Sequence, residues 1–136
     1  MKTIGCSIIF YNDKRQVLLL LRDDIPTIPY PGQWDLPGGS AEEGEQPAEA
    51  VAREMKEEMD LDIGTPDFFR VTEFEDRTEN TFFMKLNTPE TELNQKLAEG
   101  QCVQWFSVEQ IKQMELAFNF NVVVEAFFLA GKIFSK

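Results

Sequence analysis

The hydrophobic pattern at the start of the chain predicts two strands and an irregular loop. Residues 3–11 and 16–22 are apolar runs on either side of a turn-forming cluster at residues 12–15, which is typical of a β-hairpin. Residues 23–32 contain three prolines and end on a glycine, so they are incompatible with regular secondary structure. We expect this loop to border a ligand pocket.

A helix is predicted to begin at Pro47, because proline suits the first turn and apolar residues then recur at helical spacing. Its apolar stripe consists of Ala48, Val51, Ala52, Met55 and Met59. At about 100° per residue, Glu54, Glu57 and Glu58 share a neighbouring arc. Like charges at these spacings destabilise a helix by roughly 0.2–0.5 kcal/mol per pair, whereas a bound divalent cation turns the repulsion into coordination. The alternative, from the helix alone, is a solvated acidic face.

The second half of the chain predicts a further hairpin, a strand and two helices. Residues 67–75 and 81–86 alternate apolar and polar side chains around a turn at 76–80, and the polar stretch 87–99 is expected to be a loop with one weak helical turn. A strand then leads to Ser107, the expected N-cap of a helix over 108–114. Apolar residues at helical spacing over 118–134, with Gly131 near the end, predict a packing helix.

Composition favours one domain over residues 1–136. With 43% hydrophobic residues, including twelve phenylalanines, the chain can fill a single core. The net charge of −11 argues against duplex nucleic acid or an anionic membrane as partner, since both are bound through basic surface. A small anionic substrate would therefore have to be met by a metal ion. No apolar run approaches the ~20 residues of a membrane helix or forms a signal-peptide core, and we expect a cytoplasmic protein.

Histidine is absent from the chain, and its absence removes several catalytic classes. Ser/His and Cys/His nucleophile pairs and the usual zinc sites are excluded. Cys6 and Cys102 lie far apart in apolar contexts, so we expect free thiols of a reduced compartment, with a lone disulfide as the alternative. Carboxylates are left as the main candidate chemistry.

The stretch 39–61 resembles the Nudix box, G-x5-E-x7-R-E-U-x-E-E-x-G-U with U apolar. Gly39 is followed by five residues and Glu45, then by seven residues and the run Arg53-Glu54-Met55-Lys56-Glu57-Glu58-Met59-Asp60-Leu61. One fixed position departs from the pattern, because Asp60 stands where the family has glycine. Aspartate is among the few residues that tolerate the left-handed conformation, so the departure bears on the turn that ends the helix and leaves every carboxylate of the box in place.

The resemblance to Nudix hydrolases of the MutT type implies an α/β/α sandwich with a mixed β-sheet and a bound Mg²⁺ or Mn²⁺. The metal ligands that it implies are the carbonyl of Gly38 and the carboxylates of Glu54, Glu57, Glu58 and Glu99. The catalytic residues that it implies are the three box glutamates and Arg53. Arg53 would brace the loop against the helix together with Gly39 and Glu45. For Glu99, which belongs to the MutT-like run EGQCVQWFSVEQI at residues 99–111, the alternative is an exposed loop acid.

The resemblance also implies substrate contacts outside the box. Arg22 ends the second strand, where MutT-type members place an arginine near the substrate phosphates, and a surface arginine is the alternative. In those members an asparagine at the start of the last helix binds the purine. Asn119 and Asn121 both lie near that place, and capping of a helix is the alternative.

Together these residues predict a hydrolase that uses Mg²⁺ to cleave a phosphoanhydride bond of a nucleoside diphosphate linked to another group. The expected substrate is a nucleoside triphosphate, with an oxidised purine nucleotide as one option, cut to monophosphate and pyrophosphate. ADP-ribose, a nucleotide sugar or a dinucleoside polyphosphate is the alternative on the same scaffold. Glu54, Glu57 and Glu99 are the candidates for the general base. A non-catalytic binding domain would be expected to have lost some box carboxylates, and none is missing here.

Overall fold

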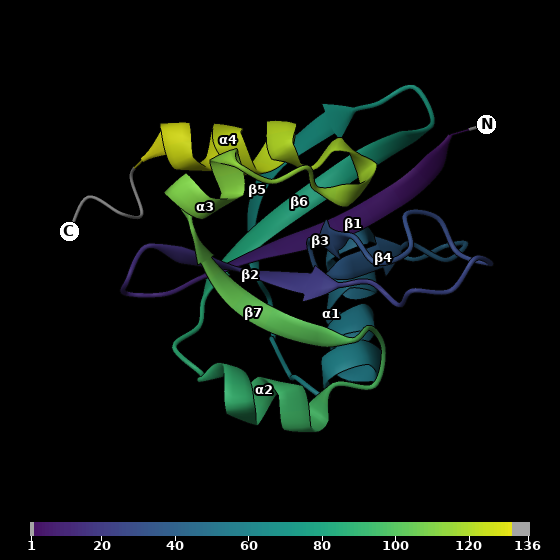
Figure 1. Ribbon diagram of the computed structural model, residues 1–136. Helices are drawn as coiled ribbons and strands as arrows, with labels where there is room; N and C mark the ends of the chain where they lie inside the picture. The colour runs from purple at the N-terminus through teal and green to yellow at the C-terminus, as the bar shows by residue number, and fades with distance from the viewer. Residues whose placement is uncertain (1, 132–136) are drawn as a thin grey trace.

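The computed structural model describes residues 2–131 and contains one mixed β-sheet between two layers of helices (Figure 1). The strands are β1 (Thr3–Tyr11), β2 (Gln16–Leu21), β3 (Trp34–Asp35), β4 (Gly38–Ser40), β5 (Asp67–Glu73), β6 (Arg77–Lys85) and β7 (Cys102–Ser107). The helices are α1 (Pro47–Met59), α2 (Glu90–Lys96), α3 (Val108–Lys112), the 3-10 turn η1 (Ala117–Asn119) and α4 (Asn121–Ala130). Because α1 and α2 cover one face and α3 and α4 the other, the expected α/β/α sandwich is confirmed.

Sheet pairing brings distant parts of the sequence together. The strand order is β3-β2-β1-β6-β5, with β4 also paired to β1 and β7 to β2. β1 and β6 run parallel, and every other pair is antiparallel. The parallel pair joins the first strand of the chain to a strand that follows α1, which is the crossover connection that parallel strands require.

β1 and β2 separate beyond their turn, and a later segment of the chain lies between them. They pair where Tyr11 meets Val17, next to the turn that the sequence predicts. Beyond that point β1 pairs with β6 and β4, and β2 pairs with β7 and β3. Asp35 of β3 is paired with β2, whereas Gly38 of β4 is paired with β1. Residues 34–40 therefore cross from one strand to the other.

Alternation along the central strand divides the core into two layers. Ile8 and Phe10 of β1 face the cluster that includes Met55 of α1, whereas Ile9 faces the cluster that includes Phe127 of α4. All five side chains are fully buried. The period of two that places successive strand residues on opposite faces therefore buries both faces of β1, which accounts for its unbroken apolar run.

The box helix begins and ends where its sequence predicts. Pro47 occupies the first turn of α1, and Gln46 and Glu49 form a capping box around it. At the other end Asp60 adopts φ 50° and ψ 43°, the left-handed conformation expected where the family pattern has glycine. Its backbone N–H donates to the carbonyl of Lys56, and the Leu61 N–H donates to that of Met55. Aspartate thus replaces the missing glycine as the helix stop.

Two boundaries in the middle of the chain differ from those predicted. β6 begins at Arg77, so most of the predicted turn at 76–80 is strand. Polar residues suggested a turn there, but Arg77 and Glu79 are buried beside β1. The stretch 87–99 contains α2, which is longer than one weak turn. Asn94 attaches α2 to β7, because its side chain accepts from Val103 N (2.8 Å) and donates to Val103 O (3.1 Å).

The C-terminal helices are shorter than their apolar periodicity suggests. Ser107 caps α3 as expected, accepting from Gln110 N at 3.2 Å, and the helix ends at Lys112. α4 begins at Asn121 instead of residue 118, because Phe118 and Asn119 have φ of 56° and 61°, which a helix does not allow. Residues 132–134 of the predicted helix lie outside the described residues.

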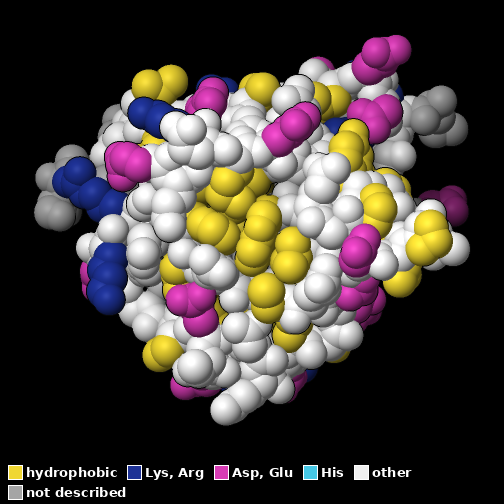
Figure 2. Space-filling view, viewed as in Figure 1, with side chains coloured by type: hydrophobic (Ala, Val, Ile, Leu, Met, Phe, Trp, Pro, Cys, Tyr) yellow, Lys and Arg dark blue, Asp and Glu magenta, His cyan; other side chains and the backbone are white. Residues whose placement is uncertain are grey.

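Figure 2 shows Asp and Glu side chains in several separate places on one face of the molecule and a band of hydrophobic side chains across its middle.

Within residues 2–131, none of the helices has the length and apolar character needed to cross a bilayer.

The left-handed residue at the end of α1 generates the first prediction. Asp60→Ala should lower the free energy of unfolding by about 1 kcal/mol relative to Asp60→Gly, because a Cβ at φ 50° costs energy that glycine avoids. Urea denaturation of the two variants measures the difference. The ion pair between Lys56 and Asp60 is exposed and is absent from both variants, so it cancels. Equal stability would contradict a left-handed stop at this position.

Candidate active site

The turn between β3 and α1 places main chain directly against a carboxylate. A Cβ added to Gly39 would lie 2.5 Å from the carboxyl carbon of Glu54, and one added to Gly38 would collide with the carbonyl of Cys6. Gly38 also has φ +150°, a conformation that other residues rarely adopt. Glycine at position 38 is therefore required for the loop to pass against β1, and at position 39 it leaves room for the carboxylate of Glu54 on α1.

Arg53 connects this loop to the helix. Its guanidinium donates to both oxygens of Glu45, at 2.8 and 3.0 Å, and to the carbonyl of Ser40 at 3.1 Å. It also donates to Glu54 and Glu57, each at 3.1 Å. The hydrogen bonds with Glu45 raise the pKa of Arg53 and lower that of Glu45, so both groups stay charged. These contacts have the geometry of a brace between loop and helix.

A cleft of about 420 Å³ opens beside the glycine turn and is bordered by three glutamates. Glu54 and Glu58 come from α1, and Glu99 from the loop before β7. The pKa of Glu58 is raised to about 10, and burial is the largest cause. The hydrogen bond with Glu54 and the charge of Glu54 come next, followed by the charge of Glu99. Glu58 is only 5% exposed, so its carboxyl keeps its proton at neutral pH.

Glu57 lies apart from this pair. Its side chain is 58% exposed and forms an ion pair with Arg53, and it does not belong to the lining of the cleft. Within residues 2–131, no three acidic or cysteine side chains already converge as a metal site. The donor set still suits a hard cation, because carboxylate oxygens of Glu54, Glu58 and Glu99 border one cleft beside the main chain of Gly38.

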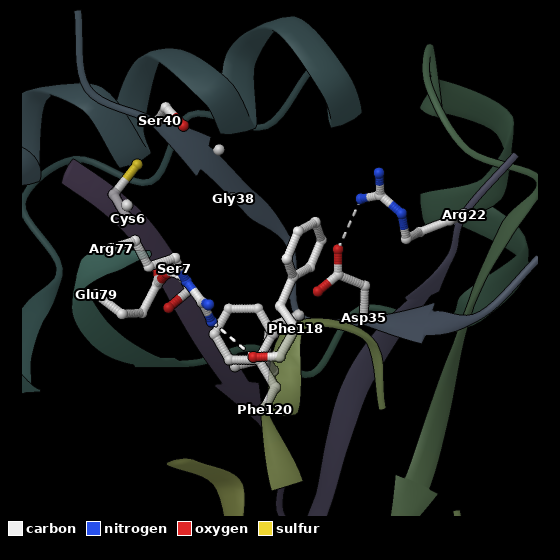
Figure 3. A pocket seen from close by; sticks show the side chains of 13 residues that line it. Cys6, Ser7, Arg22, Asp35, Gly38, Ser40, Arg77, Glu79, Phe118 and Phe120 are labelled. Carbon is white, nitrogen blue, oxygen red and sulfur yellow. Dashed lines mark hydrogen bonds and ion pairs between the residues drawn. The ribbon is translucent and has the colours of Figure 1, made fainter. Parts of the chain in front are cut away.

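A smaller cavity of about 140 Å³ adjoins the cleft, and Figure 3 shows the side chains around it. Arg22, Asp35, Gly38 and Gly39 border both spaces, so the cavity and the cleft meet at the segment that bridges β2 and β1. Phe118, from η1, stands between an Arg22–Asp35 pair on one side and an Arg77–Glu79 pair on the other.

The first of these pairs places Arg22 at the junction of the two spaces. Arg22 donates to Asp35 Oδ2 at 3.0 Å and to the carbonyl of Pro29 at 2.9 Å, and it lies 4.9 Å from the ring centre of Phe118. Burial raises the pKa of Asp35 to about 7, and Arg22 acts against that shift. Asp35 and the carbonyl of Pro29 thus hold the Arg22 guanidinium at the border of the cleft and the smaller cavity.

The second pair lies deeper in the cavity wall. Arg77 Nε donates to Glu79 Oε1 at 2.7 Å, and its Nη2 donates to the carbonyl of Phe118 at 2.7 Å. The rings of Phe74, Phe118 and Phe120 stand 4.1, 5.4 and 5.2 Å from the Arg77 guanidinium. Burial raises the pKa of Glu79, and the hydrogen bond from Arg77 is the largest influence in the other direction.

Sequence reasoning missed Asp35, Arg77, Glu79 and Phe118. The available signal was the spacing of Arg77, Glu79 and Thr81, three polar residues at alternate positions, which is how strand residues on one face recur. The predicted turn obscured that pattern. All three side chains are buried on β6.

The asparagines near α4 lie outside the lining of both spaces. Asn121 accepts from Leu116 N at 2.8 Å and donates to the carbonyl of Met114 at 2.9 Å, so its amide holds the loop that precedes α4. Asn119 is exposed in the left-handed conformation. Neither side chain caps η1 or α4, so the helix-capping alternative does not describe them, and contact with a purine stays a prediction.

The cysteines are both free, as expected. Cys6 is buried and lines the smaller cavity, and burial raises the pKa of its thiol to about 12. Cys102 is half-buried, and burial raises its pKa as well. Neither thiol is poised as a nucleophile.

The fold and the glycine–glutamate arrangement agree with a family comparison. A model described as the NUDIX domain matches residues 1–127, so the chain belongs to the NUDIX family. A MutT protein from Methanosarcina mazei Go1 has a similar structure, with a TM-score of 0.75 and 28% identity over 96% of each chain. The NUDIX domain of Shewanella oneidensis NrtR, solved with ADP ribose, shares the fold with a TM-score of 0.73 and 18% identity, over 96% of this chain and 89% of that one.

Curated relatives match over a shorter stretch. The chain is 43% identical over 58 residues to nucleoside triphosphatase NudI of Escherichia coli, a match that covers 43% of this chain and 39% of NudI. A Bacillus subtilis protein named provisionally as an 8-oxo-dGTP diphosphatase matches with the same identity over 58 residues, 43% of this chain and 35% of that protein. The chain thus spans little more than a third of the length of these relatives.

The pKa of Asp35 generates a prediction about stability. The folded state keeps the Asp35 proton up to about pH 7, whereas an unperturbed aspartate releases it near 3.8, so the free energy of unfolding falls as pH rises between these values. Asp35→Asn does not titrate. Its stability relative to the parent should therefore increase across that window, by roughly 2–4 kcal/mol. Urea denaturation with EDTA from pH 4 to 8 measures this difference.

A matched control uses an aspartate that is exposed. Asp67→Asn, at the start of β5, is measured over the same range, because its side chain is exposed and any general effect of replacing an aspartate by asparagine would appear in it as well. A stability difference for Asp35→Asn that stays constant from pH 4 to 8 would disprove the raised pKa.

Proposed function

We propose that this protein is a metal-dependent pyrophosphohydrolase that cleaves a nucleoside triphosphate to a monophosphate and pyrophosphate. The observation that carries the proposal is the close pair of Glu54 and the buried Glu58, which borders a cleft beside the Gly38–Gly39 turn and in which the pKa of Glu58 is raised by burial and by Glu54. Like charges so placed are costly in a folded protein. A divalent cation bound among them removes that cost and gives the arrangement a use.

Glu54, Glu58 and the Gly38 carbonyl are the residues that would hold Mg²⁺ or Mn²⁺. Glu99 borders the same cleft, and Glu57 would join them on release from Arg53. When bound, the metal supplies neutralisation of phosphate charge and lowers the pKa of an attacking water. A carboxylate must accept the proton of that water, and Glu54, Glu57 and Glu99 are the candidates.

Arg22 and Arg53 would act as fixed positive groups around the cleft. Arg22 borders both the cleft and the cavity and is held by Asp35, so it is placed to bind phosphate oxygens that extend between the two spaces. Arg53 would keep the glycine turn and α1 in register through its hydrogen bonds to Glu45 and Ser40. It is a positioning residue, because its donors are occupied by the protein.

The names of the relatives support a nucleotide as substrate. NudI is named a nucleoside triphosphatase, and the Bacillus subtilis relative is named after an oxidised deoxyguanosine triphosphate. The cavity of about 140 Å³ beside the metal cleft offers one ring-sized space, which suits a substrate with a single nucleoside. ADP-ribose, nucleotide sugars and dinucleoside polyphosphates are the alternative substrates, and a domain that binds without hydrolysis is the alternative function.

A hydrolysis panel tests the proposal. The protein is incubated with Mg²⁺ and each of the nucleoside triphosphates, 8-oxo-dGTP, ADP-ribose, a nucleotide sugar and a dinucleoside polyphosphate, and products are identified by phosphorus NMR. We expect monophosphate and pyrophosphate from triphosphates, and no turnover in EDTA. Turnover of the other substrates alone would redirect the assignment, and binding of Mn²⁺ and nucleotide without turnover on any substrate would favour the non-catalytic domain.

Neutral replacements of the box glutamates give a sharper prediction. Glu57→Gln and Glu58→Gln should each lower kcat/KM by at least about 100-fold, because each removes a charged oxygen donor from the metal site. Both variants should also bind Mn²⁺ more weakly in a calorimetric titration. The folded state should persist, because Glu57→Gln removes charge from a crowded acidic patch and Glu58→Gln replaces a protonated carboxyl by a neutral amide of similar size.

Glu43→Gln is the matched control for these variants. Glu43 is an exposed acid of the same loop and lies outside the lining of the cleft. It should retain parental kcat/KM and Mn²⁺ affinity. Full activity in Glu57→Gln or Glu58→Gln would show that the altered residue is not a metal ligand.

A further inference from the structure

Two buried carboxylate oxygens in the described chain have no hydrogen-bond partner, and their side chains line the same cavity. They are Oδ1 of Asp35 and Oε2 of Glu79. Both residues are at most 5% exposed. A buried acceptor without a donor costs about 1–3 kcal/mol, so a fold keeps such groups where something else satisfies them. Two of them around one cavity point to a ligand with N–H donors.

The surroundings of Glu79 prevent the protein from satisfying Oε2 by itself. Arg77 is occupied by Oε1 and by the carbonyl of Phe118, and three phenylalanine rings hold its guanidinium in place. The hydroxyl of Ser7 lowers the pKa of Glu79 and pairs with Thr81 at 2.9 Å, a contact in which either hydroxyl can be the donor, but among the described residues no donor lies within hydrogen-bond distance of Oε2. The free oxygen of Glu79 is thus a fixed acceptor.

The size and walls of the cavity suit a flat ring. Its volume of about 140 Å³ is close to that of an engineered protein cavity of about 150 Å³ that binds benzene. The rings of Phe118 and Phe120 form part of the wall. Gly5 stands directly opposite Glu79 in the sheet, where any side chain would collide with the carboxylate. One six-membered heteroaromatic ring fits this space.

The cavity adjoins the glutamate cleft, so a molecule whose ring fills the cavity can place its phosphates in the cleft. This step rests on the proposed function. Arg22, Asp35, Gly38 and Gly39 border the cavity and the glutamate cleft alike. A nucleotide can therefore seat its base beside Glu79 and direct its phosphates past Arg22 to Glu54 and Glu58.

We propose that Glu79 selects the nucleobase, with Oε2 accepting a hydrogen bond from an exocyclic amino group on a ring bound in this cavity. Cytosine places such a group at the edge of a single ring, and a purine would insert its six-membered ring. Uracil presents its N–H between two carbonyl oxygens, which would face the carboxylate and be repelled. The site therefore favours amino-bearing bases over their oxo counterparts.

Substrate pairs that differ by one amino group test this selection. The pairs are dCTP with dUTP, and dGTP with dITP, which lacks the 2-amino group. The parental enzyme should prefer the amino-bearing member of at least one pair by about 10-fold or more in kcat/KM. The member without the amino group would leave the buried Oε2 of Glu79 unpaired. Equal rates within both pairs would overturn the proposal while leaving the hydrolase assignment intact.

Glu79→Gln shows whether the discrimination comes from this side chain. Glutamine can keep its oxygen toward Arg77 and present an N–H in place of Oε2, so it should favour dUTP over dCTP and lose any preference for dGTP over dITP. The preference should fall to within about 3-fold or reverse, whereas the loss of the buried ion pair with Arg77 lowers the melting temperature without affecting the ratio. A uniform loss on all substrates would indicate a structural role and would refute the selection of the base by Glu79.

Glu73→Gln is the matched control for this variant. Glu73 is an exposed acid on β5, next to β6 and outside the cavity. It should leave both preference ratios unchanged. If the parental protein hydrolyses no nucleotide, the proposed function fails, and calorimetric titration with dCMP and dUMP decides the role of Glu79 alone. Tighter binding of dCMP that is lost in Glu79→Gln supports the proposal, and equal affinities refute it.

Discussion

The mutual repulsion of Glu54 and Glu58 is the constraint on which this site depends. Glu58 is buried, and burial together with the hydrogen bond and charge of Glu54 raises its pKa to about 10. Neighbouring parts of the structure accommodate this pair. Gly39 leaves room for the Glu54 carboxylate, and Arg53 ties the same loop to α1 while neutralising part of the acidic face. A helix so charged at one end needs such compensation in order to fold.

The separation of β1 from β2 creates the space that the pair faces. These strands meet at their turn and then take different partners, so the segment 34–40 crosses between them. The crossing carries Asp35 at one end and Gly38 at the other, and both border the cleft and the smaller cavity. Residues 34–40 thus position both Asp35, which pairs with Arg22, and the main chain of Gly38 beside the glutamates. In the proposed function, this segment links phosphate binding to base recognition.

The smaller cavity departs from the usual rule that buried polar groups are satisfied within the protein. Arg77 is fully occupied by Glu79, by a carbonyl and by aromatic rings, yet one carboxylate oxygen remains without a donor. Phe118 adopts a left-handed conformation to stand between Arg22 and Arg77. Strain and unsatisfied acceptors gathered in one place are characteristic of binding sites, because the surrounding fold has to maintain them.

The sequence by itself determined the features that depend on local spacing. Helical periodicity and the proline located α1, the tolerance of aspartate for positive φ accounted for its end at Asp60, and exact gaps identified the box. Tertiary structure decided where Arg77, Glu79 and Phe118 lie. Their polarity and periodicity predicted a turn and a helix, but parallel pairing with β1 and close packing around Arg77 overrode those local preferences. Such contacts join residues far apart in the chain, and no local pattern specifies them.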